Sequence, residues 1–397
     1  MAIKTPLSSV SIKSIKSPTD AKSRTPLRNL FSPTSTYFAH KKEEGELLGT
    51  QDFRYTVLEP NGILIADGPI EEDTWARLAF SLGIPLKQDI KQTSDIARFS
   101  YRMRKRKVVS DVQAVDCLSS LIHSLSSPLS LSQQETSDFH VDAVPTAEEH
   151  KNTKSRLPRP APSISIGYKA RAFNHIDEEL QLGIIADEAG DPVDLGRISQ
   201  PVQDHYWPFL VVEVSDHSML AAKHACAVAA ASCNNAVKLL SHAADNGGGF
   251  PSSNPFNTDT NTRHCFSLAV SGKVACLNVH GPEGKARHVT STIKSYCLDD
   301  DMDIAAMADR LRSILIWGRF SRLPAIIDKL EALDRKVNGV NKACYMVSYT
   351  DDFDPAIFKT LDLRASRNKK KRAAAQVGLP AWARSGGVLR SGGILTS

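Results

Sequence analysis

Several features that would identify common protein classes are missing from this sequence of 397 residues. Its seven cysteines include no Cys-x-x-Cys pair and follow no secretory signal, so we expect reduced thiols in the nucleus or cytoplasm. No apolar run reaches the length of a membrane span, so we expect no membrane partner. A Gly-x-Ser-x-Gly elbow and a P-loop are also missing, so the sequence gives no support for a serine hydrolase or a P-loop nucleotidase.

Positive charge is in slight excess and is unevenly placed along the chain. The net charge is +5 and the pI is about 8.7, which indicates an acidic partner only weakly. Residues 1–43 are basic and rich in Ser, Thr and Pro, and residues 349–397 form a second basic stretch. Both compositions predict disordered tails, because neither can bury enough apolar surface to fold.

One basic run stands out in the second tail. Six of the nine residues from Arg364 to Arg372 are basic, and the run ends with Lys369, Lys370, Lys371 and Arg372. Such a run predicts a nuclear localisation signal or a nucleic-acid contact. The alternative is an ordinary solvated tail.

The region between residues 44 and 160 divides into a helical part and a polar part. Residues 44–125 are predicted to be helical, with one helix beginning at the acidic residues that follow Gly68. A later basic run, Arg102 to Lys107, could contact phosphates or could be a solvated helix face. Residues 126–160 are rich in Ser and then in Pro, and they predict a linker or long loop.

Residues 161–348 carry the alternating pattern of an α/β domain. The predicted strands are at 162–173, 180–187 and 207–214, the hairpin is at 264–281 and a further strand is at 286–298. The predicted helices are at 217–245, 302–320 and 321–336. This order predicts a mixed sheet flanked by helices.

A carboxylate interrupts the strongest of these strand patterns. Leu210, Val211 and Val212 form a continuous apolar run, as expected for a central strand that is covered on both faces. Glu213 follows where another apolar residue would fit. A buried Glu is costly unless it is ion-paired, hydrogen-bonded or bound to a metal, so Glu213 is a candidate site residue as well as a candidate structural residue.

The order of the short patterns resembles the PD-(D/E)XK nuclease-like proteins that are common in filamentous fungi. That family typically has Pro-Asp and then Gly-Tyr, a strand ending Val-Val-Glu-Phe-Lys, a helix with spaced Cys and Ser-Cys-x-Asn, a Phe-Ser strand and a Trp-Gly. The resemblance covers about residues 155–335. The matching residues are Pro162, Gly167, Tyr168, Leu210, Val211, Val212, Glu213, Cys226, Ser232, Cys233, Asn235, Phe266, Ser267, Trp317 and Gly318.

The resemblance implies a restriction-endonuclease-like sheet and metal-dependent phosphodiester cleavage. In that family an Asp and a Glu on neighbouring strands hold Mg²⁺, and a Lys two residues after the Glu helps to activate water. Here Ser163 stands in place of the Asp and Ser215 in place of the Lys, so that only Glu213 is retained. We therefore expect a catalytically degenerate, nuclear, nuclease-like protein that binds DNA or RNA through basic patches.

Two other hypotheses stay open. An active Mg²⁺-dependent nuclease would need migrated groups: Asp216 or Asp204 as the acid, Glu213 with Asp216 as metal ligands, and Lys223 as the cation. Alternatively, the fold is a protein-interaction module, and the basic tail serves only for nuclear import.

A zinc site is not expected, although four of its usual ligands lie close together in the sequence. They are His217, His224, Cys226 and Cys233. On a helix, the two histidines and the two cysteines would project about 160° to 200° apart. One tetrahedral site cannot readily use all four.

Overall fold

The protein is described from a computed structural model, which covers most of the central part of the chain. The described residues are 48–86, 93–105, 111–145, 147, 155–186, 190–216, 218–245, 262–283 and 287–338. The predicted tails, including the run from Lys369 to Arg372, lie outside the described residues.

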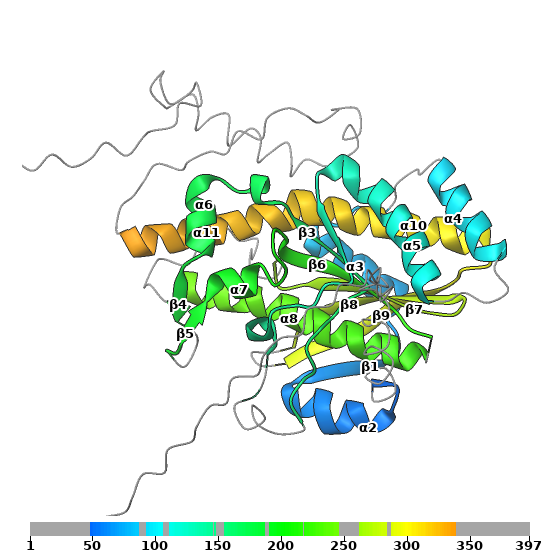
Figure 1. Cartoon of the computed structure of the whole chain (residues 1–397), viewed down its shortest axis with the longest axis horizontal. Coiled ribbons are helices and arrows are strands. Elements are labelled where there is room, and N and C mark those ends of the chain that lie inside the picture. The colour runs from blue at the N-terminus through cyan, green and yellow to red at the C-terminus, as the bar shows by residue number, and fades with distance from the viewer. Residues whose placement is uncertain are drawn as a thin grey trace, which may run out of the picture.

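A mixed sheet forms the centre of the molecule, as the sequence predicted, and it has seven strands (Figure 1). The strand order is β1-β9-β8-β7-β6-β3-β2; β6–β7 and β1–β9 are parallel pairs, and the other neighbours are antiparallel. The strands are β1 (Ile63–Pro69), β2 (Ser132–Glu135), β3 (Ile164–Tyr168), β6 (Tyr206–Val214), β7 (Cys265–Ser271), β8 (Val274–Glu283) and β9 (Arg287–Cys297).

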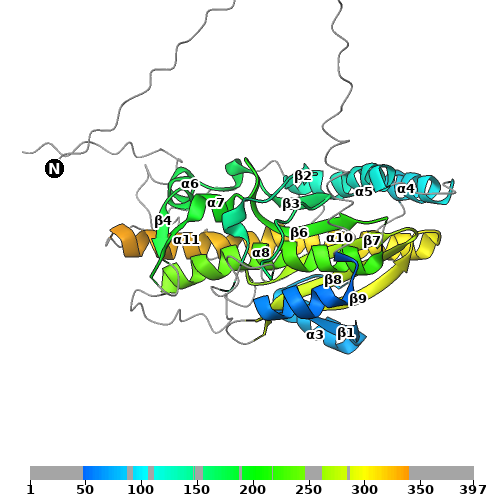
Figure 2. The same ribbon diagram turned by 60° about the horizontal axis from the view of Figure 1, so that its bottom comes forward.

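Helices cover both faces of this sheet. The long helix α8 packs on one face and connects β6 to its parallel neighbour β7, while α3 and α10 pack on the other. Figure 2 shows α4 and α5 together at one end of the molecule. The helices are α2 (Gln51–Phe53), α3 (Glu72–Leu82), α4 (Ser94–Lys105), α5 (Asp111–Ser126), α6 (His175–Gln181), α7 (Leu195–Ser199), α8 (Met219–Asp245), α10 (Asp301–Trp317) and α11 (Leu323–Asn338).

The chain from β6 through α8 to β7 confirms the strongest sequence patterns. All nine residues of β6 are buried, because the strand lies inside the sheet with helices on both faces. The Ala-rich sequence of α8 lets the helix backbone lie close to the sheet, where Ala222 packs with Ala269 of β7 and Cys276 of β8.

Three sequence predictions about the other elements need correction. The helical region 44–125 contains β1, and the predicted linker 126–160 contains β2, so both segments are parts of the main sheet. The predicted strand at 180–187 is β4 (Ile184–Ala186), which pairs only with β5 (Pro192–Asp194) in a separate two-stranded sheet. The later part of the predicted helical region contains two helices, α4 and α5. β2 and β4 are short, and β1 and β2 are edge strands with few buried residues, which weakens their apolar alternation.

The Trp-Gly pattern at the end of α10 has a packing explanation. A Cβ atom at Gly318 would overlap the ring of Phe209 on β6, so only glycine fits there. The Tyr168 hydroxyl donates a hydrogen bond of 2.7 Å to the Gly318 carbonyl, and the Trp317 ring meets Phe209 edge to face. These contacts hold β3 and β6 in position against α10. No helix in the described part of the chain is long and apolar enough to cross a membrane.

Candidate functional site

Glu213 lies one residue before the end of β6 and is only 2% exposed. Its neighbour on β7 is Ala269, which packs beneath α8, so the Glu213 side chain lies on the face of the sheet that α8 covers. The carboxylate is therefore placed at a covered strand end and not on an open surface.

Ser163 is the nearest site residue to Glu213. Ile164 pairs with Val212 in the antiparallel register of β3 and β6, which places Ser163 directly opposite Glu213. The Ser163 Oγ donates a hydrogen bond of 3.3 Å to Glu213 Oε2 and accepts one of 3.2 Å from the Val214 amide. Ser163 is itself 2% exposed. One buried hydroxyl thus links the carboxylate to the backbone of its own strand.

Ser215 and Asp216 follow the end of β6. The Ser215 amide continues the β6–β7 ladder with a hydrogen bond of 2.9 Å to the Val270 carbonyl, and its side chain is half-buried. Asp216, one residue further, is exposed. Ser215 supplies a hydroxyl, not the ammonium that the nuclease family would have there.

Lys223 does not approach Glu213. Its Nζ donates a hydrogen bond of 3.1 Å to the Thr292 Oγ1 on β9, three strands beyond β6. At a strand spacing of about 4.8 Å, that places the ammonium group roughly 14 Å across the sheet. Asp204 is also distant, because it lies in the turn before β6, at the opposite end of the strand. The hypothesis that Lys223 or Asp204 supplies a migrated catalytic group therefore does not fit the structure.

The residues around Glu213 do not form a suitable Mg²⁺ site. Mg²⁺ requires near-octahedral oxygen coordination, usually from one or two carboxylates with several waters. Glu213 is buried, and it accepts a hydrogen bond from the neutral hydroxyl of Ser163, which brings no negative charge to the site. Among the described residues, no group of three or more His, Cys, Asp or Glu side chains could hold a metal ion.

Three of the four residues that were considered as zinc ligands are described, and each has different surroundings. The His224 Nδ1 donates to the Leu48 carbonyl at 2.7 Å. Cys226 packs in one cluster with Ala269, and Cys233 packs in another with Val211. His217 lies outside the described residues.

A buried polar network lies beneath α8, and the sequence analysis missed it. His280 on β8 contacts Ser267 at 2.7 Å and Thr290 at 2.8 Å, and Asn278 donates to the same Ser267 at 3.1 Å. Burial lowers the pKa of His280 to about 3, so its imidazole is neutral at physiological pH. The inward-facing polar residues of the hairpin were a signal for this network. Both ring nitrogens of His280 contact hydroxyl groups, and Asn278 Oδ1 accepts a hydrogen bond of 3.0 Å from Thr292, the residue that also bonds the Lys223 ammonium.

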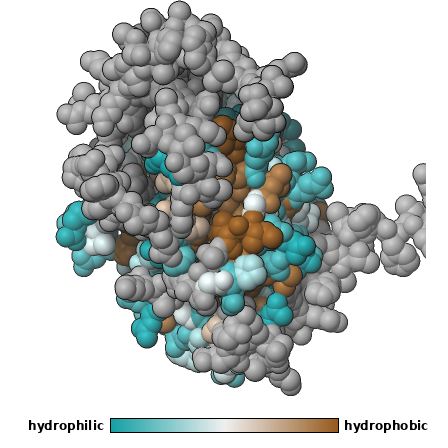
Figure 3. All heavy atoms as spheres, turned by 90° about the vertical axis from the view of Figure 1, so that its left-hand side faces the viewer, coloured by the Kyte–Doolittle hydropathy of each residue, from teal (hydrophilic) through white to brown (hydrophobic). Residues whose placement is uncertain are grey.

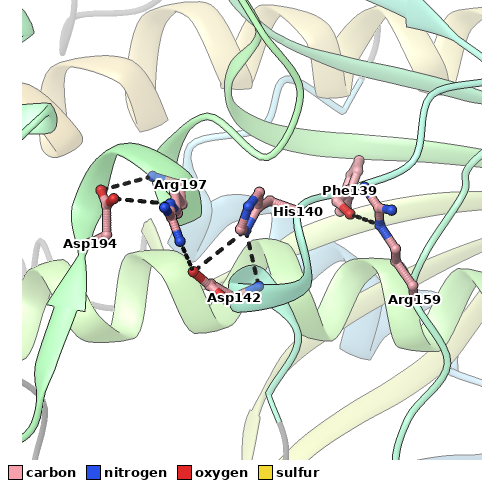
Figure 4. Close-up of polar contacts among 6 residues, drawn as sticks. All are labelled: Phe139, His140, Asp142, Arg159, Asp194 and Arg197. Atoms are coloured by element: carbon pink, nitrogen blue, oxygen red, sulfur yellow. Dashed lines mark hydrogen bonds and ion pairs between the residues drawn. The ribbon is translucent and has the colours of Figure 1, made fainter. Parts of the chain in front are cut away.

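A second polar cluster, at the protein surface, is structural (Figure 4). Arg197 on α7 forms ion pairs with Asp142 at 3.0 Å and with Asp194 at 3.1 Å. The His140 Nδ1 accepts a hydrogen bond from the Asp142 amide at 3.2 Å. Arg197 therefore ties the segment before β3 to α7, and its charge is already paired with two carboxylates.

The basic run predicted at residues 102–107 lies partly on α4. Arg104 pairs with Asp301 at 3.0 Å, while Arg102 and Lys105 lie on another side of the helix. Arg106 and Lys107 lie outside the described residues. Two neighbours on that side, Arg98 and Tyr101, belong to the same surface, and helical spacing could have identified them from the sequence.

Comparison with protein-family models places much of the chain in a family. A family model described as a domain of unknown function, DUF7924, matches residues 98–330, which is 233 of the 397 residues. The match begins within α4 and ends within α11. It therefore includes Ser163, Glu213 and the helix α8, which connects β6 to β7. No curated protein matches the chain.

Proposed function

The chain belongs to the DUF7924 family, and from that premise we propose that it is a nucleic-acid-binding protein built on a restriction-endonuclease-like sheet without nuclease activity. It acts in the nucleus, where the basic run from Lys369 to Arg372 directs it. DNA and RNA are both candidate partners at this level of the proposal.

The order of elements supports the nuclease-like fold. β3 and β6 are antiparallel neighbours, and β6 is followed by the long helix α8 and then by β7, which is parallel to β6. The Phe-Ser pattern lies on β7, and the Trp-Gly pattern ends α10. This is the order in which the nuclease-like family carries the corresponding patterns.

The main support for a lack of nuclease activity is the pair formed by Ser163 and Glu213. Where the nuclease-like family has two carboxylates, this chain has one carboxylate and a hydroxyl at 3.3 Å. The hydroxyl removes one negative charge from the position where Mg²⁺ would need it, and it gives Glu213 a hydrogen-bond donor in place of a metal. Ser163 and Glu213 stabilise the junction of β3 and β6 and take no part in phosphodiester cleavage.

The distribution of charge supports nucleic-acid binding through particular segments. Residues 1–47 contain eight Lys or Arg and four Asp or Glu, and residues 339–397 contain ten and four. The remaining residues, 48–338, contain 31 basic and 36 acidic residues and are therefore net negative. Phosphate contacts come from the two basic ends of the chain and from local basic surfaces such as α4.

Two measurements on the full chain test this function. Fluorescence anisotropy with labelled oligonucleotides should show binding that weakens steeply as the salt concentration rises, because counterions are released from phosphates. Incubation of the protein and the same oligonucleotides with Mg²⁺ or Mn²⁺ should give no cleavage. Calorimetric titration with Mn²⁺ should give the same result for the wild type and for Glu213→Gln. Metal-dependent cleavage that Glu213→Gln removes would establish the active nuclease instead.

One surface observation favours the alternative function, a protein-interaction module. Figure 3 views the side of the molecule that carries α6, β4 and β5, and an apolar region is visible there. Leu182 and Ile184 are 67% and 73% exposed. Sedimentation analysis of the wild type and of a Leu182→Ser/Ile184→Ser variant tests this function. Self-association that the variant loses would support it, and a monomer in both cases would remove this support.

A further inference from the structure

The helix α4 has two sharply different sides. Ile96, Phe99 and Met103 are almost fully buried and fix the helix against the rest of the domain. Ser100, on the same side, donates a hydrogen bond to Asp301 at the start of α10. These contacts determine which residues of α4 face outward.

Four outward residues form one continuous strip, which we call the α4 surface: Arg98, Tyr101, Arg102 and Lys105. At 100° per residue, they fall within an arc of about 100° on the side opposite the buried residues. Arg98, Tyr101 and Lys105 are exposed, and Arg102 is half-buried. From Arg98 to Lys105 the strip is about 10 Å long, roughly the span of three nucleotides of one strand.

The charge of the α4 surface is not neutralised by the surrounding fold. Arg104, on a different side of the helix, is the residue that pairs with Asp301. No carboxylate among the described residues forms an ion pair with Arg98, Arg102 or Lys105. The one acid on α4 is Asp95, in its first turn. Within the described part of the chain, α4 therefore presents three cations without an ion pair, which is the charge that a polyanion would bind.

Tyr101 adds a contact that a phosphate alone would not use. Tyr101 is 53% exposed, and the Lys105 Nζ lies 4.5 Å from the centroid of its ring. An exposed aromatic ring among cations is the arrangement with which proteins bind single strands, since the bases stack on the ring and the cations follow the backbone. In a duplex the base faces are already stacked and cannot reach the ring.

We propose that the α4 surface binds single-stranded nucleic acid, with Arg98, Arg102 and Lys105 on the phosphates and Tyr101 stacked on a base. The assignment rests on the proposed function, namely that the protein binds nucleic acid, and adds the surface and the strandedness. A bilayer of anionic lipid offers the same charge, but Tyr101 is the only large hydrophobic side chain of α4 that is exposed, too little to anchor a helix in lipid.

The α4 surface also lies at the same end of the sheet as Glu213. The Asp303 carboxylate of α10 accepts a hydrogen bond from the Cys297 amide at the end of β9. Cys297 pairs with Val274, which begins β8 just after the β7–β8 turn. On the other side of that turn, Val270 of β7 pairs with Val214, the residue after Glu213. A strand on the α4 surface would therefore lie at the end of the sheet where β6 ends.

The test uses the full chain and two background forms, wild type and a form with Lys369, Lys370, Lys371 and Arg372 changed to Gln. The second background removes phosphate binding by the C-terminal run. Labelled single-stranded and duplex oligonucleotides of the same sequence are titrated by anisotropy at several salt concentrations. Melting temperatures of all variants are recorded, so that loss of folding is distinguished from loss of binding.

Three variants carry the decision. Arg98→Gln/Arg102→Gln should weaken single-strand binding and make the salt slope shallower by about 1.4, since each phosphate contact contributes about 0.7. Tyr101→Ala should weaken it roughly tenfold with little change in slope, and Tyr101→Trp should retain it. Arg77→Gln, on the exposed side of α3, is the matched control and should change neither quantity.

Each contrary outcome has a distinct meaning. If all three α4 variants bind the single strand as tightly as the wild type does, the assignment of binding to the α4 surface is wrong, while the proposed function still holds. Tighter binding to the duplex, unaffected by Tyr101→Ala, would overturn the single-strand assignment. No binding of either oligonucleotide by the wild type would overturn both proposals. Binding only to vesicles of anionic lipid, lost in Arg98→Gln/Arg102→Gln, would identify a membrane surface instead.

Discussion

Restoring the missing carboxylate in Ser163→Asp is the most informative perturbation of the candidate site. The Ser163 Oγ lies 3.3 Å from Glu213 Oε2, so an aspartate there would place two carboxylates side by side in a buried position. Two unit charges about 4 Å apart repel by about 4 kcal/mol at an effective dielectric constant of about 20. One of the two carboxyl groups should therefore have its pKa raised by roughly 3 units.

The sign of the pH effect follows from that raised pKa. A carboxyl whose pKa is higher in the folded state than its unfolded value of about 3.9 destabilises the protein increasingly as the pH rises above 4. The free energy of unfolding of Ser163→Asp should fall relative to Ser163→Asn between pH 4 and pH 7, by about 4 kcal/mol at most. Urea denaturation at a series of pH values measures this difference, and Ser163→Asn controls for the lost hydroxyl.

Two further measurements complete the test. The double variant Ser163→Asp/Glu213→Gln should recover the lost stability, because only one carboxylate remains. Mn²⁺ should raise the melting temperature of Ser163→Asp and leave the wild type unchanged, since a ligand that binds only the folded state stabilises it. Equal stability of Ser163→Asp and Ser163→Asn at pH 8, without a Mn²⁺ effect, would refute the adjacency of these two side chains and the account of the lost metal site.

Three other variants test separate parts of the structure. Burial raises the pKa of Asp177 to about 7, so the free energy of unfolding of the wild type should fall by up to about 4 kcal/mol between pH 4 and pH 7. This pH dependence should be missing in Asp177→Asn when denaturation is measured at a series of pH values. Gly318→Ala should lower the free energy of unfolding by at least about 1–3 kcal/mol because its methyl group overlaps Phe209, and Phe209→Leu should recover part of that loss; an unchanged melting temperature would contradict this packing. Lys223→Met should leave oligonucleotide binding and any Mn²⁺ response unchanged in calorimetry, because the Lys223 ammonium bonds Thr292 and not Glu213.

The parts of the fold that the sequence predicted are those with a long, regular pattern. β6 is an almost continuous apolar run interrupted by Glu213, and α8 is a 27-residue Ala-rich helix, so both elements follow from the sequence pattern alone. β2 has the sequence Ser-Gln-Gln-Glu, which contains no apolar alternation. Its place in the sheet comes from backbone pairing with β3, and a one-dimensional pattern cannot reveal that pairing.

The candidate site was predictable to a similar extent. Resemblance to a nuclease-like family placed Ser163 beside Glu213, and the structure brings them together. The direction of Lys223 was not predictable, because it depends on how α8 crosses the sheet and on the position of Thr292 in β9. For the α4 surface, the basic run from Arg102 was visible in the sequence, but only helical spacing connects it with Arg98 and Tyr101.

The parallel pairing of β1 with β9 has a practical consequence for the preparation of this protein. A fragment trimmed to the family match, residues 98–330, would begin inside α4, end inside α11 and lack β1 altogether. The backbone amides and carbonyls of β9 from His288 to Thr292 would then lose their partners and offer an open template for another chain. Such a fragment should aggregate, whereas one that spans residues 48–338 retains both edges of the sheet in their native state.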